Sequence, residues 1–121
     1  MDGVLRCFTD GAAKGNSPNA SAGWGFYIPK LNVRKSGHII GTNNVAELTA
    51  VKELYKYILT LSDPLHQNFE KPYDLPEITV FSDSRYVIGA MTGNKISANK
   101  ELINEIFELA IISINIVKFY I

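Results

Sequence analysis

The feature that most constrains the fold of this chain is a change in hydrophobic period near residue 44. The first forty residues hold short apolar runs bounded by Gly, Ser, Asn and Pro, which is typical of strands joined by turns. From residue 44 to about residue 61, apolar side chains recur every three or four positions, which is the spacing of an amphipathic helix. A chain that begins with strands and then alternates between the two periods is expected to form an α/β domain.

The order of expected elements is β-β-β-α-β-α-α-β. Three antiparallel strands followed by strands that are separated by helices imply a five-stranded mixed sheet flanked by helices. With 121 residues, 46% of them hydrophobic and 20% charged, the chain is expected to form a single domain over residues 1–121. The expected strands are residues 3–9, 23–28, 33–40, 77–82 and 114–121, and the expected helices are residues 44–61, 84–91 and 99–112.

Charge and cysteine content narrow the class of protein. Twelve basic and twelve acidic residues cancel, which argues against a strongly basic nucleic-acid-binding protein. Cys7 is the only cysteine, so the chain forms no internal disulfide and we expect an intracellular, cytoplasmic protein. The most apolar segment, residues 109–121, contains Lys118 and is shorter than the roughly 20 apolar residues that span a bilayer. We therefore expect no membrane partner.

Three acidic residues stand where the expected elements begin or end. Asp10 follows the first strand, Glu47 lies in the first turn of the long helix, and Asp83 lies between a strand and a helix. Each also has a purely local explanation. Asp10 and Gly11 fit a simple turn, and Asp83 fits a helix N-cap. Glu47 stands three residues after Asn44, which is the spacing of a capping box.

Taken together, the three acids fit a metal site. If the first and fourth strands are neighbours, Asp10 and Asp83 emerge at adjacent positions, and the helix between them can bring Glu47 over the same point. Carboxylates that lie close together repel, and a hard divalent cation such as Mg²⁺ removes the repulsion. Two such ions about 4 Å apart suit phosphodiester hydrolysis, because they activate a water and stabilise the leaving oxygen.

Four segments that surround these acids occur in a fixed order: TDGAAKGNSPNASAGWGFYI, GTNNVAELTAV, FSDSRYVIGAMTGN and ANKEL. Together they closely resemble type 1 ribonuclease H over nearly the whole chain. The resemblance implies a ribonuclease H-like fold and an endonuclease that cleaves the RNA strand of RNA–DNA hybrids with two Mg²⁺ ions, or with Mn²⁺ in their place. The alternative function is a ribonuclease H-like module that binds hybrid or duplex without cutting it.

The resemblance also implies the residues of the site. Asp10, Glu47 and Asp83 would be the metal ligands and catalytic residues, with Asp10 bridging both ions. Thr42 and Asn99 would hold a phosphate of the DNA strand. The residues that would contact the RNA strand in the minor groove, where 2′-hydroxyls are displayed, are Gly11, Asn16, Asn43 and Asn44, with Arg85 adding a charge beside them.

The end of the sequence departs from the family pattern. In the family, a Gly-His loop and a final helix that bears a fourth active-site Asp follow the fifth strand, whereas this sequence ends at Ile121. We therefore expect a C-terminally incomplete domain without the final helix, with impaired catalysis. Apolar sheet surface would be left exposed, and a C-terminal segment or self-association would cover it.

Two further residues have structural explanations. Tyr86 fits equally a contact with DNA sugars or plain packing of the short helix over residues 84–91. His38 lies in an expected strand and does not match the family's catalytic-loop histidine, so we expect it to be structural.

Overall fold

The computed structural model describes residues 4–61, 77–93, 98–113 and 117–120 of the chain. The expected loop over residues 62–76 and part of the expected last strand lie outside these ranges. The elements, in chain order, are β1 (Val4–Ala13), β2 (Ser21–Ile28), the short 3₁₀ helix η1 (Pro29–Leu31), β3 (Val33–Ile40), α1 (Asn43–Leu61), β4 (Glu77–Phe81), α2 (Arg85–Met91), α3 (Lys100–Ser113) and β5 (Val117–Tyr120).

The strands form one mixed sheet in the spatial order β3-β2-β1-β4-β5. β1 and β3 pair with β2 in antiparallel register, whereas β1 pairs with β4, and β4 with β5, in parallel. The predicted mixed sheet with helices is therefore confirmed. The first and fourth strands are neighbours, which is the condition on which the convergence of the three acids depends.

β1 is longer than the sequence predicts. The expected strand stopped before Asp10, whereas β1 continues to Ala13. Antiparallel pairing with β2 extends it, because Asp10 lies opposite Gly25 in the ladder. The explanation of Asp10 as part of a turn is therefore wrong, and the loop to β2 begins at Lys14.

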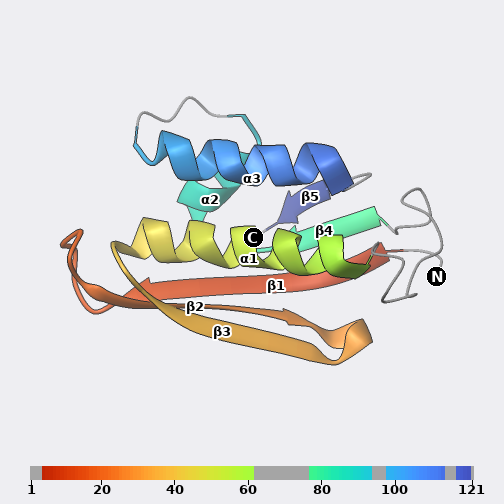
Figure 1. Cartoon of the computed structure of the whole chain (residues 1–121), viewed down its shortest axis with the longest axis horizontal. Coiled ribbons are helices and arrows are strands. Elements are labelled where there is room, and N and C mark those ends of the chain that lie inside the picture. Colours follow the sequence, from red (N-terminus) through yellow and green to blue (C-terminus); the bar gives the residue numbers. More distant parts are fainter. Residues whose placement is uncertain (1–3, 62–76, 94–97, 114–116, 121) are drawn as a thin grey trace.

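One hydrophobic core joins the helices to one face of the sheet. Figure 1 shows α1 lying along β1, with α3 packed on the far side of α1. The apolar positions of α1 recur at helical spacing because one face of the helix is buried against the sheet. All three described helices contribute to this core. Its members include Leu5, Cys7, Phe26, Ile78 and Val80 from the sheet, Leu48, Val51, Leu54, Tyr55 and Ile58 from α1, Val87 and Ala90 from α2, and Ile103 and Ile106 from α3.

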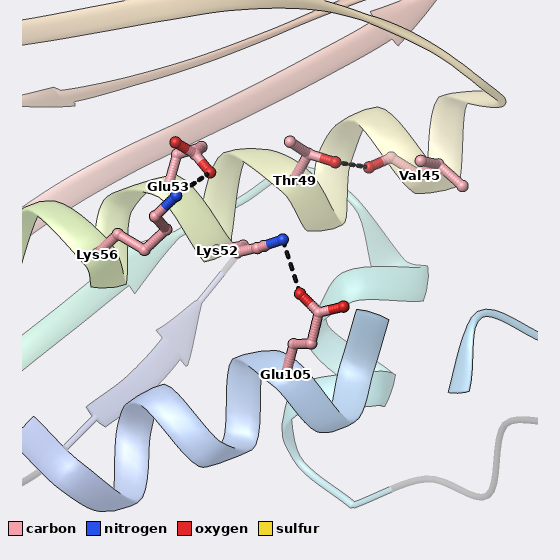
Figure 2. A network of polar contacts seen from close by, with 6 residues as sticks. All are labelled: Val45, Thr49, Lys52, Glu53, Lys56 and Glu105. Carbon is pink, nitrogen blue, oxygen red and sulfur yellow. Dashed lines mark hydrogen bonds and ion pairs between the residues drawn. The ribbon is translucent and has the colours of Figure 1, made fainter. Parts of the chain in front are cut away.

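Ion pairs lie on the surface where α1 meets α3. Lys52 Nζ of α1 lies 2.7 Å from Glu105 Oε2 of α3, and Lys56 Nζ lies 3.5 Å from Glu53 Oε2 within α1 (Figure 2). These side chains are partly or largely exposed to solvent, so each pair contributes at most about 1 kcal/mol to stability. The docking of α3 on α1 therefore depends chiefly on the apolar side chains beneath the ion pairs.

The helices of the described ranges differ in length and hydropathy. α1, with 19 residues, is the longest of them. Within those ranges, none combines enough length with enough hydropathy to cross a lipid bilayer.

The sheet face that points away from α1 carries a row of aromatic and basic side chains. Because side chains alternate along a strand, Phe8 points away from the core that Cys7 enters. Phe8 pairs with Tyr27 and Tyr27 with Arg34, whose guanidinium carbon lies 3.9 Å from the centre of the Tyr27 ring. Phe8 also stacks on Phe81, with 5.0 Å between ring centres, yet remains 42% exposed. Aromatic surface is therefore accessible on this face of the described domain.

Truncation of Leu54 tests the placement of the core. Leu54 is fully buried on α1, so Leu54→Ala removes buried methyl groups and leaves a cavity. We expect the free energy of unfolding, measured by urea denaturation, to fall by about 2–5 kcal/mol. Ile40→Ala is the control, because Ile40 is 58% exposed at the end of β3. The control should change stability by about 0.5 kcal/mol or less, and equal losses for the two variants would contradict this core.

Candidate active site

The parallel pairing of β1 with β4 brings two aspartates together. Phe8 pairs with Phe81 at the end of the ladder. Asp10 lies two residues after Phe8, and Asp83 lies two residues after Phe81. The parallel ladder ends at this pair, and each aspartate follows two residues later on its own segment. The two aspartates therefore lie side by side at the end of β4.

α1 brings Glu47 to the same point because its main chain touches the main chain of β1. A methyl group at Gly11 would lie 2.5 Å from the carbonyl carbon of Ala46 and 2.6 Å from the amide nitrogen of Glu47. These atoms belong to the backbone of a helix and cannot rotate away, so only glycine permits this approach. Besides the RNA contact that the resemblance implies, Gly11 therefore has a packing role that positions Glu47.

The N-termini of α1 and α2 are capped by hydroxyl groups and not by Glu47 or Asp83. The Thr42 hydroxyl accepts a hydrogen bond of 3.2 Å from an amide in the first turn of α1. The Ser84 hydroxyl accepts one of 3.2 Å from an amide in the first turn of α2. The explanations of Glu47 as half of a capping box and of Asp83 as an N-cap are therefore wrong. Both carboxylates are left for another role.

The three carboxylates form one cluster. One oxygen from each of Asp10, Glu47 and Asp83 lies within 4.8 Å of the other two. The two aspartates are exposed, whereas Glu47 is only 7% exposed. Burial, followed by the negative charges of Asp83 and Asp10, raises the pKa of Glu47 to about 7, although hydrogen bonds from the Gly11 amide and the Ser84 hydroxyl act in the opposite direction.

The oxygen atoms of this cluster fit a divalent cation. Glu47 Oε1 is buried and has no hydrogen-bond partner among the described residues. A buried carboxylate oxygen without a partner is costly unless a cation or a donor satisfies it. Carboxylate oxygens are the ligands that Mg²⁺ prefers, and the ion keeps its remaining positions for water and substrate phosphate. The predicted metal site is therefore compatible with the geometry of these side chains.

Several of the other predicted residues lie at the same end of the domain. The side-chain oxygen of Asn43 accepts a hydrogen bond from the Ala13 amide, which ties the start of α1 to the end of β1. Asn44 is exposed in the first turn of α1, and Asn16 is exposed in the loop between β1 and β2. Arg85 is the exposed first residue of α2.

Asn99 belongs to a second polar group, which the sequence did not reveal. Its side-chain nitrogen donates a hydrogen bond of 2.9 Å to the hydroxyl of Tyr86, and that hydroxyl donates one of 3.2 Å to the Ala98 carbonyl. Tyr86 also packs against the core, which agrees with the packing role considered for it. His38 forms a hydrogen bond of 2.8 Å with Ser21, in agreement with a structural role.

The fold and the cluster together define a class of protein: a mixed α/β domain with an acidic, cation-compatible site at the ends of adjacent parallel strands. A sequence model of the RNase H family matches residues 2–119, and the chain therefore belongs to the RNase H family.

Curated relatives support this assignment. The chain is 39% identical over 84 residues to ribonuclease H of Tropheryma whipplei strain Twist, in an alignment that covers 69% of this chain and 43% of the relative. The ribonuclease H of strain TW08/27 of the same organism matches with the same values. The matched part of the chain thus spans less than half the length of these relatives.

Solved structures are similar over almost the whole chain. LC11-RNase H1, isolated from compost by a metagenomic approach, has a TM-score of 0.76 and 27% sequence identity, with 96% of this chain and 81% of that chain covered. The crystal structure of LC11-RNase H1 in complex with an RNA/DNA hybrid has a TM-score of 0.68 and 26% identity, with 96% and 83% covered.

Gly11→Ala tests whether the contact between backbones positions Glu47. The added methyl group would overlap the main chain of α1, so the helix must shift away from β1. We expect unfolding free energy to fall by about 1–3 kcal/mol and Mn²⁺ affinity, measured by isothermal titration calorimetry, to fall about 10- to 100-fold. Gly15→Ala is the matched control, because a methyl group at Gly15 would meet nothing within 4 Å. Wild-type affinity in Gly11→Ala would rule out this positioning role.

The raised pKa of Glu47 makes the stability of the metal-free protein depend on pH. In the unfolded chain Glu47 ionises near its ordinary pKa of 4.5, and in the folded protein near 7. Between these values the folded state binds the extra proton. The stability that protonated Glu47 contributes is therefore complete below the lower pKa and is lost as the pH rises through the higher one.

Glu47→Gln isolates this dependence, because the amide does not ionise. Relative to wild type, the variant should gain stability between about pH 5 and about pH 8 when both are unfolded by urea in the presence of EDTA. Mg²⁺ should stabilise the wild type at the upper end of this range and leave the variant nearly unchanged. Stability curves that run parallel from acidic to alkaline pH would contradict the burial of an ionisable Glu47.

Proposed function

We propose that this chain is a metal-dependent endonuclease that hydrolyses the RNA strand of RNA–DNA hybrids. The observation that carries the proposal is the cluster of Asp10, Glu47 and Asp83, whose oxygens lie within 4.8 Å of one another in a member of the RNase H family. LC11-RNase H1, to which the chain is similar, was solved with an RNA/DNA hybrid. This likeness supports the same class of substrate.

The three carboxylates would hold two Mg²⁺ ions, or Mn²⁺ in their place. Such ions would activate a water and stabilise the leaving oxygen of the cleaved phosphodiester. Glu47 is kept in place by the contact of α1 with Gly11 and would give up its proton on binding, because a metal ligand must be ionised. Asp10 and Asp83 are exposed, which leaves their side open to the approach of a phosphate.

The proposed substrate contacts flank the carboxylates. Because the side-chain oxygen of Asn43 is occupied by the Ala13 amide, its NH₂ group is the part that is left to donate to the RNA strand. The exposure of Asn16, Asn44 and Arg85 supports a role for them at the surface of the hybrid. The proposed RNA-binding residues are Gly11, Asn16, Asn43, Asn44 and Arg85, and those proposed for a DNA-strand phosphate are Thr42 and Asn99.

The extent and location of the functional unit are part of the proposal. Residues 1–121 would act as one domain, because β1, β2, β4 and the helices α1, α2 and α3 all contribute buried residues to one hydrophobic core. Impaired catalysis, and cover of exposed apolar sheet surface by a C-terminal segment or a second copy, stay predictions. A cytoplasmic location is likewise predicted, from the free and buried Cys7.

Asp10→Asn tests the proposed site. The amide keeps the size of the side chain but removes the charge that binds cations. We expect cleavage of the RNA strand in a labelled hybrid, with Mg²⁺ or Mn²⁺, to slow at least about 100-fold, the scale of one group that stabilises a transition state. Glu105→Gln is the matched control, because Glu105 pairs with Lys52 on the surface of α3 and should not affect cleavage.

Equal cleavage by wild type and Asp10→Asn would rule out these carboxylates as the active site. Binding of the hybrid by the wild type without any metal-dependent cleavage would instead favour a non-catalytic binding module.

A further inference from the structure

The pair formed by Tyr86 and Asn99 links two helices by a contact that the carboxylate site does not require. Tyr86 lies in α2, and Asn99 directly precedes α3. The Asn99 Nδ2 atom lies 2.9 Å from the Tyr86 hydroxyl, which itself donates to the Ala98 carbonyl over 3.2 Å. α2 thereby holds the side chain of the residue that directly precedes α3.

These hydrogen bonds fix which end of the Asn99 amide faces Tyr86. A tyrosine hydroxyl has one hydrogen, and here it goes to the Ala98 carbonyl, so the hydroxyl can only accept from Asn99. The NH₂ end of the amide therefore faces Tyr86. One of its two N–H groups is used in this bond, and the second is left to donate to a ligand. Phosphate oxygens are frequent acceptors of such bonds from asparagine.

The backbone of Asn99 is also held in an uncommon conformation. Its φ is 59°, in the left-handed region that residues other than glycine seldom adopt. Its carbonyl accepts a hydrogen bond of 3.0 Å from the Ile103 amide, so it occupies the N-cap position of α3, where extended backbone is usual. Asparagine tolerates the left-handed region better than most residues. The local conformation thus keeps the side chain beside Tyr86 at the expense of the usual N-cap geometry.

We propose that Tyr86 is a positioning residue, which holds the Asn99 carboxamide so that its second N–H meets a phosphate of the DNA strand. This inference rests on the function proposed above, in which Asn99 contacts that phosphate. Tyr86 needs no contact with substrate or metal in this role. It acts by removing the rotational freedom that an unrestrained amide would lose on binding.

Two variants and one control test the contributions of the Tyr86 hydroxyl and the Asn99 amide. Tyr86→Phe removes only the hydroxyl. Asn99→Gly removes the amide but keeps the left-handed backbone free of strain. Tyr57→Phe is the control for loss of a tyrosine hydroxyl, because Tyr57 lies on α1 and packs its ring against Phe26. Each is assayed on an RNA–DNA hybrid and on the same hybrid with neutral methylphosphonate groups in the DNA strand.

We expect Tyr86→Phe to raise the KM for the hybrid about 3- to 10-fold while kcat changes less than about twofold, as the loss of one hydrogen bond predicts. Asn99→Gly should raise KM at least as much, and the double variant no further than Asn99→Gly alone. Methylphosphonate DNA should weaken binding by the wild type and by Tyr57→Phe more than binding by either of the other variants. A merely structural role would lower the melting temperature and leave KM unchanged.

An unchanged KM in Tyr86→Phe would overturn the inference, as would a double variant whose loss equals the product of the two single losses. Cleavage that depends on Asp10 would then remain, and the proposed function would stand. If the wild type neither binds nor cleaves the hybrid, both proposals fail together.

Discussion

The parallel pairing of β1 with β4 is the constraint on which the rest of the structure depends. It joins parts of the chain that are far apart in sequence: the Thr9 hydroxyl donates a hydrogen bond of 3.4 Å to the Phe81 carbonyl, 72 residues away. Closing so long a segment costs entropy, which burial of the apolar strand residues beneath α1 must offset. The juxtaposition of the two aspartates in the acidic site follows from this pairing, because it sets Asp10 and Asp83 at one level.

The acidic cluster is electrostatically unfavourable in the metal-free protein. Glu47 is buried beside two other carboxylates, with one oxygen that lacks a partner among the described residues. A structure selected for stability alone would place an apolar residue or an amide there. Perturbed groups of this kind cluster at functional sites, and membership of the RNase H family gives this one a chemical context.

Much of this arrangement could be predicted from the sequence, because periodicity and turn residues report local structure well. The end of β1 could not, since Asp10 and Gly11 read locally as a turn and only pairing with β2 extends the strand. The places of the three acids at the ends of expected elements, together with the motifs around them, identify these residues, but the burial of Glu47 depends on how closely α1 approaches β1. The bond between Tyr86 and Asn99 left no signal, because it joins residues 13 positions apart on different elements.

The contact at Gly11 has a consequence for how the domain tolerates sequence change. The height of α1 above β1 is set there by main-chain atoms rather than by the volume of side chains. Because a steric contact resists only closer approach, substitutions among the apolar residues of α1 cannot bring the helix nearer to β1 than this contact allows. The missing Cβ atom of Gly11 thereby sets the shortest distance between α1 and β1 at the acidic cluster, whatever the size of the apolar side chains elsewhere on the helix.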